Sequence, residues 1–193
     1  MSGKNLYIIS GPNGAGKTTA SYTVLPKILN CKEFVNADEI ARGLSPFNPE
    51  GMAIEAGKLM LKRIDELLQK EESFSIETTL ATRSYFKLVE AAHQKNYDVT
   101  LLYFWLKSPE QAAQRVAERV AKGGHDIPEY IIERRFWAGL NNLFNIYMPI
   151  VDTWLLVNNS ETPRTIIATG GKNQTTKIED ITNFTKIKEY VKD

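Results

Sequence analysis

The chain of 193 residues has little cysteine, histidine or net charge. Cys31 is the single cysteine, so an internal disulfide is excluded, and a lone thiol without activating neighbours is expected to be buried and inert. The formal net charge is +1, which excludes a general attraction of the whole chain to nucleic acid, anionic membranes or acidic partners. We therefore expect neither nucleic acid nor a membrane as the partner.

Long apolar runs are also missing. No window approaches the roughly 18 apolar residues of a membrane-spanning helix, and the N-terminus lacks the apolar stretch and cleavage site of a secretory signal. With the unpaired cysteine, these absences predict a cytoplasmic protein. The hydrophobic fraction of 42% is ordinary for a soluble protein, and neither repeats nor a linker divides the sequence. We expect residues 1–193 to form a single domain with a sizeable core.

Short apolar runs alternate with longer amphipathic segments along the chain. This alternation predicts an α/β fold, a three-layer sandwich in which helices cover both faces of a mostly parallel sheet of five or six strands. The polar tail after residue 171 predicts a hairpin strand and a short final helix. The expected strands are residues 6–9, 33–36, 73–76, 99–106, 153–157 and 165–168, and the clearest helices are 50–70, 85–95, 109–120 and 128–143.

A glycine-rich loop follows the first expected strand. Residues 11–18 read Gly-Pro-Asn-Gly-Ala-Gly-Lys-Thr and match the pattern G-x-x-x-x-G-K-[ST] in full. Glycines let successive backbone N–H groups turn towards phosphate oxygens, and the helix that begins there adds its positive dipole end. Lys17 can reach the β- and γ-phosphates, and the Thr18 hydroxyl is placed to ligate Mg²⁺. The predicted nucleotide-binding residues of this phosphate-loop fold are Gly11, Pro12, Asn13, Gly14, Ala15, Gly16, Lys17, Thr18 and Thr19.

Two motifs of other phosphate-loop proteins are missing. No strand of four apolar residues ends in Asp-Glu, the pattern of many ATPases that remodel DNA or proteins. No Asn-Lys-x-Asp run is present to select guanine, as in most GTPases. Both absences favour a kinase that acts on a small molecule.

Acidic residues follow two further strands. Asp38 and Glu39 come after residues 33–36, and Glu77 comes after residues 73–76. Ligands of open α/β sheets bind outside the carboxyl ends of the strands, so these carboxylates are candidates for the site. Asp38 could accept the proton of an attacking hydroxyl group, or it could cap a helix that begins near Glu39. Glu77 could contact the substrate or the metal, or it could be a buried hydrogen-bonding group.

A basic helical segment at residues 110–140 is interrupted by a Gly-Gly break at 123–124. Arg115 and Arg119 lie four residues apart and therefore share one helix face, and Arg134 follows in the next helix. Many small-molecule kinases close a mobile lid whose arginines offset the charge on the transferred phosphoryl group. The segment predicts such a helical lid. A solvated face paired with nearby glutamates is the alternative.

Together these motifs resemble the zeta-toxin family of phosphate-loop kinases, particularly its short stand-alone members. The resemblance runs from residue 6 to about residue 158 and is most specific in the phosphate loop at 11–18. The other matching segments are Val35-Asn36-Ala37-Asp38, Ile76-Glu77-Thr78-Thr79, and the stretch from Arg119 through Gly123-Gly124-His125-Asp126 to Arg134.

The resemblance implies an ATP-dependent phosphotransferase. The family's known reaction transfers the γ-phosphate of ATP, with Mg²⁺, to a hydroxyl group of UDP-N-acetylglucosamine, and an antitoxin protein is the expected partner. The toxins' second lid arginine has no fixed counterpart here, since His125 aligns near it and Arg134 could serve from the next helix. The implied catalytic residues are Lys17, Asp38, Arg119 and Arg134, and the implied acceptor-binding residues are Asp38, Glu77, Thr79 and His125.

Two functions are therefore carried forward. The first is an ATP-dependent kinase that acts on a small hydroxylated molecule, for which a nucleotide sugar is the example that the resemblance provides. The second is a regulatory or interaction ATPase without a small acceptor, whose hydrolysis a protein or nucleic acid would stimulate. The chain is shorter than the toxins, so fold and kinase chemistry carry over more directly than the acceptor.

Overall fold

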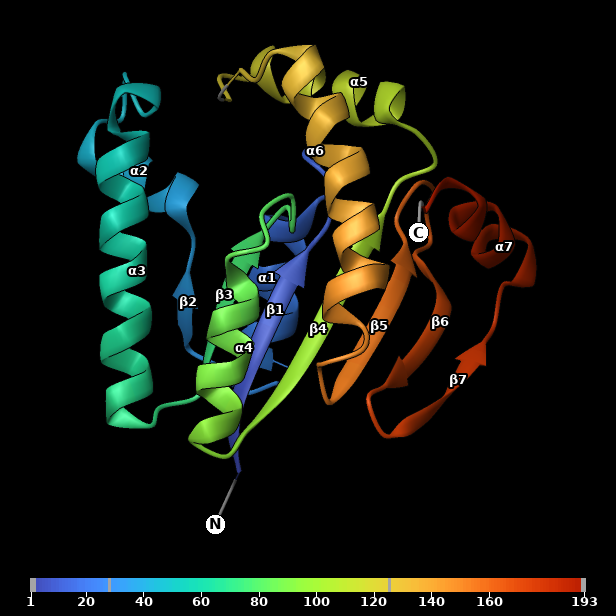
Figure 1. Ribbon diagram of the computed structural model, residues 1–193. Coiled ribbons are helices and arrows are strands. Elements are labelled where there is room, and N and C mark those ends of the chain that lie inside the picture. The colour runs from blue at the N-terminus through green and yellow to red at the C-terminus, as the bar shows by residue number, and fades with distance from the viewer. Residues whose placement is uncertain (1–2, 28, 125, 192–193) are drawn as a thin grey trace.

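The computed structural model describes residues 3–27, 29–124 and 126–191. Within these ranges, seven strands form one sheet in the order β2-β3-β1-β4-β5-β6-β7 (Figure 1). The strands from β2 to β5 run parallel, and β6 and β7 are antiparallel to their neighbours. The strands are β1 (Lys4–Ser10), β2 (Glu33–Val35), β3 (Phe74–Thr78), β4 (Tyr97–Trp105), β5 (Thr153–Asn158), β6 (Thr165–Gly171) and β7 (Gln174–Ile178).

Helices connect most of these strands. α5 begins at the residue that its sequence predicts, because the Ser108 side chain accepts the N–H of Gln111 and Pro109 stands in the first turn. No helix in the described ranges is both long and apolar enough to span a bilayer. The helices are α1 (Lys17–Lys27), α2 (Ala37–Leu44), the 3₁₀ helix η1 (Glu50–Met52), α3 (Ala53–Lys70), α4 (Tyr85–Gln94), α5 (Pro109–Val120), α6 (Glu129–Asn142), the π-helix η2 (Leu143–Tyr147) and α7 (Ile181–Tyr190).

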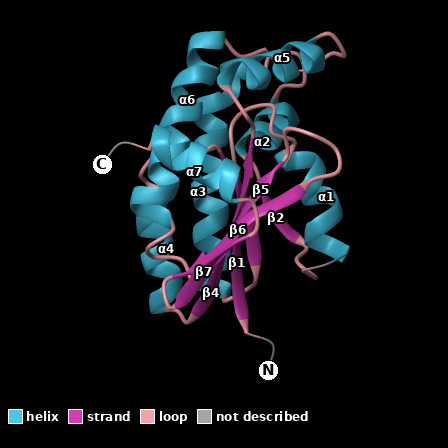
Figure 2. Ribbon diagram, turned by 90° about the vertical axis from the view of Figure 1, so that its right-hand side faces the viewer, coloured by secondary structure: helices cyan, strands magenta, loops and turns pink. Residues whose placement is uncertain are grey.

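The sheet separates two hydrophobic cores. Leu6 and Ile8 of β1 are buried against α3, α4 and the end of α6, whereas Tyr7 and Ile9 are buried against α1 and α5. This division follows from the alternation of side chains along a strand. Figure 2 shows the sheet between α1 on one side and α3, α4 and α6 on the other. The predicted three-layer α/β sandwich is confirmed.

The sheet has one strand more than the five or six expected. β7 was predicted only as a hairpin strand of the polar tail, yet it extends the main sheet beyond β6. All residues of β7 are exposed. An exposed edge strand does not need the alternation of apolar and polar residues that identifies a half-buried strand, so its sequence carries no strong strand signal.

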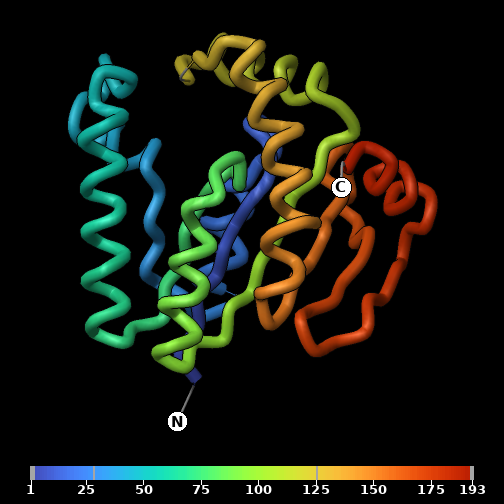
Figure 3. The backbone as a smooth tube through the Cα atoms, in the orientation of Figure 1, coloured from blue at the N-terminus to red at the C-terminus, as the bar shows by residue number. Residues whose placement is uncertain are grey.

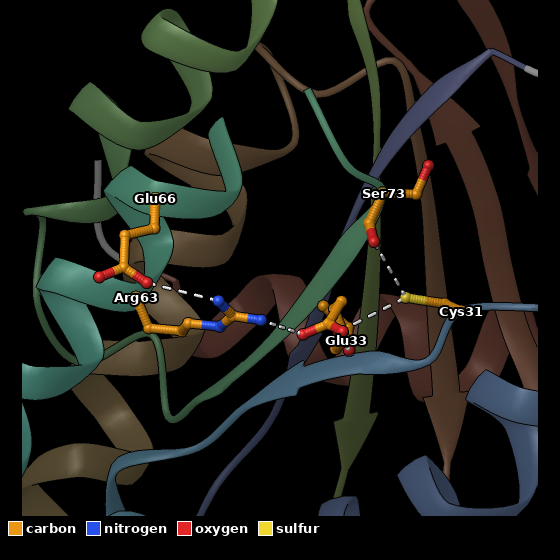
Figure 4. Close-up of polar contacts among 6 residues, drawn as sticks. Cys31, Glu33, Arg63, Glu66 and Ser73 are labelled. Carbon is orange, nitrogen blue, oxygen red and sulfur yellow. Dashed lines mark hydrogen bonds and ion pairs between the residues drawn. The ribbon is translucent and has the colours of Figure 1, made fainter. Parts of the chain in front are cut away.

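Polar contacts fasten the short edge strand β2 to the rest of the fold (Figure 4). Arg63 of α3 donates to a Glu33 carboxylate oxygen at 2.6 Å and to a Glu66 carboxylate oxygen at 3.3 Å. Cys31 precedes the strand, and its Sγ lies 3.6 Å from the carbonyl oxygen of Glu33. Cys31 is buried. Because burial raises the pKa of its thiol, the thiol is protonated at neutral pH. The expectation of a buried cysteine is confirmed.

A charged cluster joins the amino ends of β4 and β5, at the edge of the sheet opposite the glycine-rich loop. The Asp152 carboxylate accepts from Lys172 Nζ at 2.6 Å and from the Val99 N–H at 2.8 Å, and it lies 2.9 Å from His93 Nε2. Burial alone would raise the pKa of Asp152, but these partners outweigh burial and lower it. Asp152 therefore stabilises the fold in its ionised form.

We expect the Asp152→Asn substitution to reduce the free energy of unfolding at neutral pH and to matter less in acid. A carboxyl whose folded pKa is depressed contributes stability above its unfolded pKa of about 4 and loses that contribution as the pH falls through the folded value. Urea unfolding between pH 3 and 7 measures the difference. Asp65→Asn, on the surface of α3, is the matched control. If the difference in the free energy of unfolding between the wild type and Asp152→Asn does not change with pH, this account of Asp152 is contradicted.

Candidate functional site

The glycine-rich loop leaves β1 and enters α1, as predicted. Gly11, Gly14 and Gly16 have positive φ angles of 138°, 76° and 73°. A Cβ atom at Gly11 would clash with the carbonyl oxygen of Phe104 on β4, so the loop can pass this strand only with glycine at that position. Backbones of this kind direct successive N–H groups towards a bound anion, and the first turn of α1 adds its positive dipole end.

Lys17 lies buried at the base of this loop. The residue is 7% exposed, and its Nζ donates to the Pro12 carbonyl oxygen at 2.9 Å. Burial lowers the pKa of Lys17, and the nearby carboxylates of Glu77 and Asp38 oppose this shift. A fixed ammonium group at the loop is therefore in place to meet phosphate oxygens.

Thr18 and Glu77 meet beside Lys17. The Thr18 hydroxyl lies 2.9 Å from each carboxylate oxygen of Glu77. Burial raises the pKa of Glu77, whereas the Lys17 charge and the Thr18 hydroxyl hold it down. A hydroxyl and a carboxylate are oxygen ligands of the type that Mg²⁺ prefers when it binds together with phosphate groups. Thr18, predicted as the metal ligand, and Glu77 therefore fit a Mg²⁺ ion.

Asn36 holds the first turn of α2. Its side chain accepts from the N–H groups of Asp38 and Glu39, at 2.8 and 3.4 Å. The alternative in which Asp38 caps the helix is therefore wrong: Asn36 has the extended backbone of a cap, and Asp38 stands inside the helix. Asp38 instead lines a cavity together with Lys17.

This cavity has a volume of about 490 Å³ and lies at the carboxyl ends of β1, β2 and β3. Strand register brings its walls together, because Val35 pairs with Ile76 and Ser10 pairs with Thr78. Met60 and Tyr85 add apolar surface to the polar lining. Six residues predicted from separate parts of the sequence line it: Asn13, Lys17, Asp38, Glu77, Thr79 and Arg134.

The arginines of the helical segment divide between two cavities. Arg134 and Arg135 of α6 line the cavity that contains Lys17, whereas Arg119 of α5 lines a neighbouring one. Burial is the main cause of the lowered pKa of Lys17, and the charges of Arg119 and Arg135 lower this pKa further. Both arginines therefore lie within electrostatic reach of the loop. His125, predicted to contact the substrate, lies outside the described residues.

Arg135 was missed from the sequence as a site residue. The Arg-Arg pair at 134–135 is the available signal, but adjacent helical residues point in directions about 100° apart, and the sequence does not show how α6 is rotated. In the structure both arginines reach the cavity wall.

The connection after β5 braces the phosphate loop. Asn159 Nδ2 donates to the Ala15 carbonyl oxygen at 2.6 Å, and Arg164 Nε donates to Asn159 Oδ1 at 2.8 Å. Arg115 donates to the carbonyl oxygens of Asn159 and Ser160 at 2.8 and 3.0 Å. The sequence predicts no role for Asn159. No local pattern could reveal its role, because its contact joins residues 144 positions apart.

Comparison with known sequences identifies a family model and a relative that match this chain. The family model described as AAA_33, AAA domain, matches residues 6–136. An uncharacterized protein of Haemophilus influenzae (strain ATCC 51907 / DSM 11121 / KW20 / Rd) is 28% identical over 126 residues, which make up 65% of this chain and 88% of that protein.

Solved structures share the fold. Crystal structures of the AvrRxo1-ORF1:AvrRxo1-ORF2 complex match with a TM-score of 0.76 and 16% identity in the form with sulphate ions, and with 0.74 and 17% in the form with ATP. Both matches cover 96% of this chain, which spans only 63% of the matched chain's length. The PezAT toxin-antitoxin structure of Streptococcus pneumoniae matches with a TM-score of 0.70 and 15% identity, over 99% of this chain and 79% of that one. At such identities the likeness is one of fold.

Proposed function

Since the chain belongs to the family described as AAA_33, AAA domain, and carries an acidic group beside its phosphate loop, we propose that it is an ATP-dependent phosphotransferase for a small hydroxylated molecule. The supporting observation is that Asp38, Lys17 and Glu77 line one cavity of about 490 Å³. A cavity of this size suits a small organic acceptor. The AvrRxo1 complex of similar fold, crystallised with ATP, supports ATP as the nucleotide.

In this reaction each residue has a role set by its position. The loop N–H groups and Lys17 bind the β- and γ-phosphates. Asp38 takes the proton of the acceptor hydroxyl while that oxygen bonds to the γ-phosphorus, the bond from this phosphorus to the β–γ bridging oxygen breaks, and ADP leaves. Mg²⁺, when bound by Thr18 and Glu77, would offset the negative charge of the phosphate oxygens.

The helical segment at residues 110–140 would act as the lid over this reaction. Arg134 and Arg135 already line the cavity, and the charge of Arg119 reaches Lys17. In a closed lid, these guanidinium groups would stabilise the charge on the transferred phosphoryl group and exclude water. We keep His125 as a further candidate for contact with the acceptor.

A finer proposal concerns the acceptor and a partner. The sequence resemblance to zeta toxins supports a nucleotide sugar such as UDP-N-acetylglucosamine, with Asp38, Glu77 and Thr79 in contact with the sugar. The fold shared with the PezAT toxin-antitoxin structure supports a separate antitoxin protein that binds this chain. Both fit a cytoplasmic enzyme that acts as one domain.

A regulatory ATPase is the second candidate, and the family's description as an AAA domain favours it. Such a protein would hydrolyse ATP without a small acceptor, and a protein or nucleic acid would stimulate it. It would have no evident use for Asp38 in the cavity that extends from Lys17 to Tyr85, which is the reason that we place the kinase first.

We expect ATP consumption to rise when the protein is given a pool of nucleotide sugars and other small hydroxyl compounds. The reason is that Asp38 has no hydroxyl group to deprotonate in their absence except that of water. The assay compares ADP formation with and without the pool, and mass spectrometry identifies the phosphorylated product. If ADP formation is unchanged by the pool but rises with added protein or nucleic acid, the regulatory ATPase replaces the kinase.

A further inference from the structure

An apolar trough of about 440 Å³ lies between α3 and α4. Figure 3 shows these two helices (blue-green and green) next to each other, and Figure 2 places both on the same side of the sheet. Met60, Leu61 and Ile64 of α3 line one side of the trough, and Tyr85 and Leu88 of α4 line the other. Its walls are therefore mainly hydrocarbon and one aromatic ring.

The trough continues from the cavity that contains Lys17. Ala37, Met60 and Tyr85 line both. Tyr85 Oη donates to Met60 Sδ at 3.9 Å, so two of the shared residues join α3 to α4. Ala37 directly precedes Asp38, the proposed general base. A molecule whose hydroxyl group lies at Asp38 can therefore extend from the cavity into the trough.

The protein leaves part of this apolar surface in contact with water. Met60 and Ile64 are 4% and 5% exposed and belong to the core, but Leu61 of the same helix is 65% exposed. Lys87 is the charged residue of the lining and is exposed, and a lysine can lay its methylene groups along apolar surface while its ammonium group stays in water. Such a lining favours apolar ligand groups, because binding removes both surfaces from water.

Gly57 lines the trough from α3 and adds no side chain to it. It lies inside the helix, where glycine is less favourable than every residue except proline. A Cβ atom at this position would meet no other atom within 4 Å in the described part of the chain. The fold would therefore accept a larger residue here, and the helix would gain from it, but that side chain would occupy the trough. An open trough requires this glycine, whereas folding does not.

We propose that the trough is a subsite for an apolar group of the acceptor. This inference rests on the proposed kinase function, and it specifies an acceptor that carries a short alkyl chain or an aromatic ring beside the hydroxyl group that Asp38 deprotonates. Gly57 then determines specificity, because the space it leaves sets the size of the group that fits between α3 and α4. An acceptor without an apolar group would leave the hydrocarbon of the trough in water.

The first test is a binding measurement that needs no turnover. The phosphate loop is filled with Mg²⁺ and a non-hydrolysable ATP analogue, and the neutral apolar dye N-phenyl-1-naphthylamine is titrated while its fluorescence is followed. We expect the dye to bind the wild type and to bind Gly57→Leu at least about tenfold more weakly, because the leucine occupies the trough.

Gly43→Leu is the matched control for the dye titration. Gly43 also lies within a helix, and a Cβ there would likewise meet no atom within 4 Å among the described residues, but Gly43 is not part of the trough. This variant should bind the dye as the wild type does. Gly57→Leu should unfold at the wild-type temperature or about 2–4 °C above it, so that weaker binding cannot be attributed to a damaged fold.

The second test is kinetic and uses any acceptor that the pool of hydroxyl compounds identifies. Alkyl derivatives that keep the reacting hydroxyl group should have a KM lower by up to about fourfold for each methylene that is buried. This dependence on chain length should appear in the wild type and in Gly43→Leu, and it should be lost in Gly57→Leu.

Two results would overturn the subsite. Equal dye binding by the wild type and Gly57→Leu would show that the trough is not a binding site. An equal dependence of KM on chain length in these two proteins would show that the acceptor does not use the trough, which would then be left to another molecule such as a partner protein. The kinase proposal fails separately: if no compound in the pool is phosphorylated while the dye still distinguishes Gly57→Leu from the wild type, the trough stands as a site for an apolar small molecule.

Discussion

Replacing Asp38 with asparagine is expected to slow phosphoryl transfer by about 10²–10⁴-fold while ATP binding stays unchanged. Asparagine has nearly the same shape but cannot take the proton of the acceptor hydroxyl. The substitution should preserve α2, because the cap is supplied by the side chain of Asn36, which accepts the backbone N–H of residue 38. Turnover with ATP and acceptor measures the loss of transfer. Calorimetry with a non-hydrolysable ATP analogue measures nucleotide binding.

Asp98→Asn is the matched control for this experiment, because Asp98 is an exposed residue near the amino end of β4. It removes the same charge at the opposite edge of the sheet and should leave turnover at the wild-type rate. Wild-type turnover by Asp38→Asn would sink the assignment of Asp38 as the general base. A parallel loss of ATP binding would instead indicate that Asp38 supports the nucleotide site.

The fold and much of the site could be predicted because their signals are local. The phosphate loop is one uninterrupted motif, and the strand before it and the helix after it are set by the residues beside it. Asp38 and Glu77 could be predicted as residues of the same site because the carboxyl ends of parallel strands meet at one edge. Each prediction needed only the type of one residue and its place relative to a strand.

What could not be predicted depends on side-chain direction and on distant contacts. The choice between Asn36 and Asp38 as the cap depends on where α2 begins, and sequence patterns place helix ends only within a few residues. The cavity that Arg119 lines depends on how α5 lies against α2. The brace from Asn159 to Ala15 depends on the pairing of β5 with β4, which places Asn159 beside the loop.

Replacing Lys17 with methionine is expected to lower phosphoryl transfer by about 10³-fold, because a fixed charge at the γ-phosphate is lost. Nucleotide binding should weaken as well, since Lys17 faces phosphate in the ground state and in the transition state. Lys27→Met, at the exposed end of α1, is the control and should retain activity. Retention of wild-type turnover by Lys17→Met would show that the loop does not use this residue for transfer.

The same substitution should change how stability depends on pH. Burial raises the pKa of Glu77, and the Lys17 charge opposes that rise, so the Glu77 pKa should climb further in Lys17→Met. A carboxyl with a raised folded pKa contributes stability that is full below its unfolded pKa of about 4 and is lost as the pH rises through the folded value. Lys17→Met should therefore lose more stability than the wild type between pH 4.5 and 7.5, as measured by thermal unfolding without ligand. The methionine also removes an ammonium group whose burial is unfavourable, as its lowered pKa shows, so the variant's loss of stability should be smallest at the acidic end. A variant that is equally destabilised across this range would mean that Lys17 holds the fold together rather than setting the charge of the site.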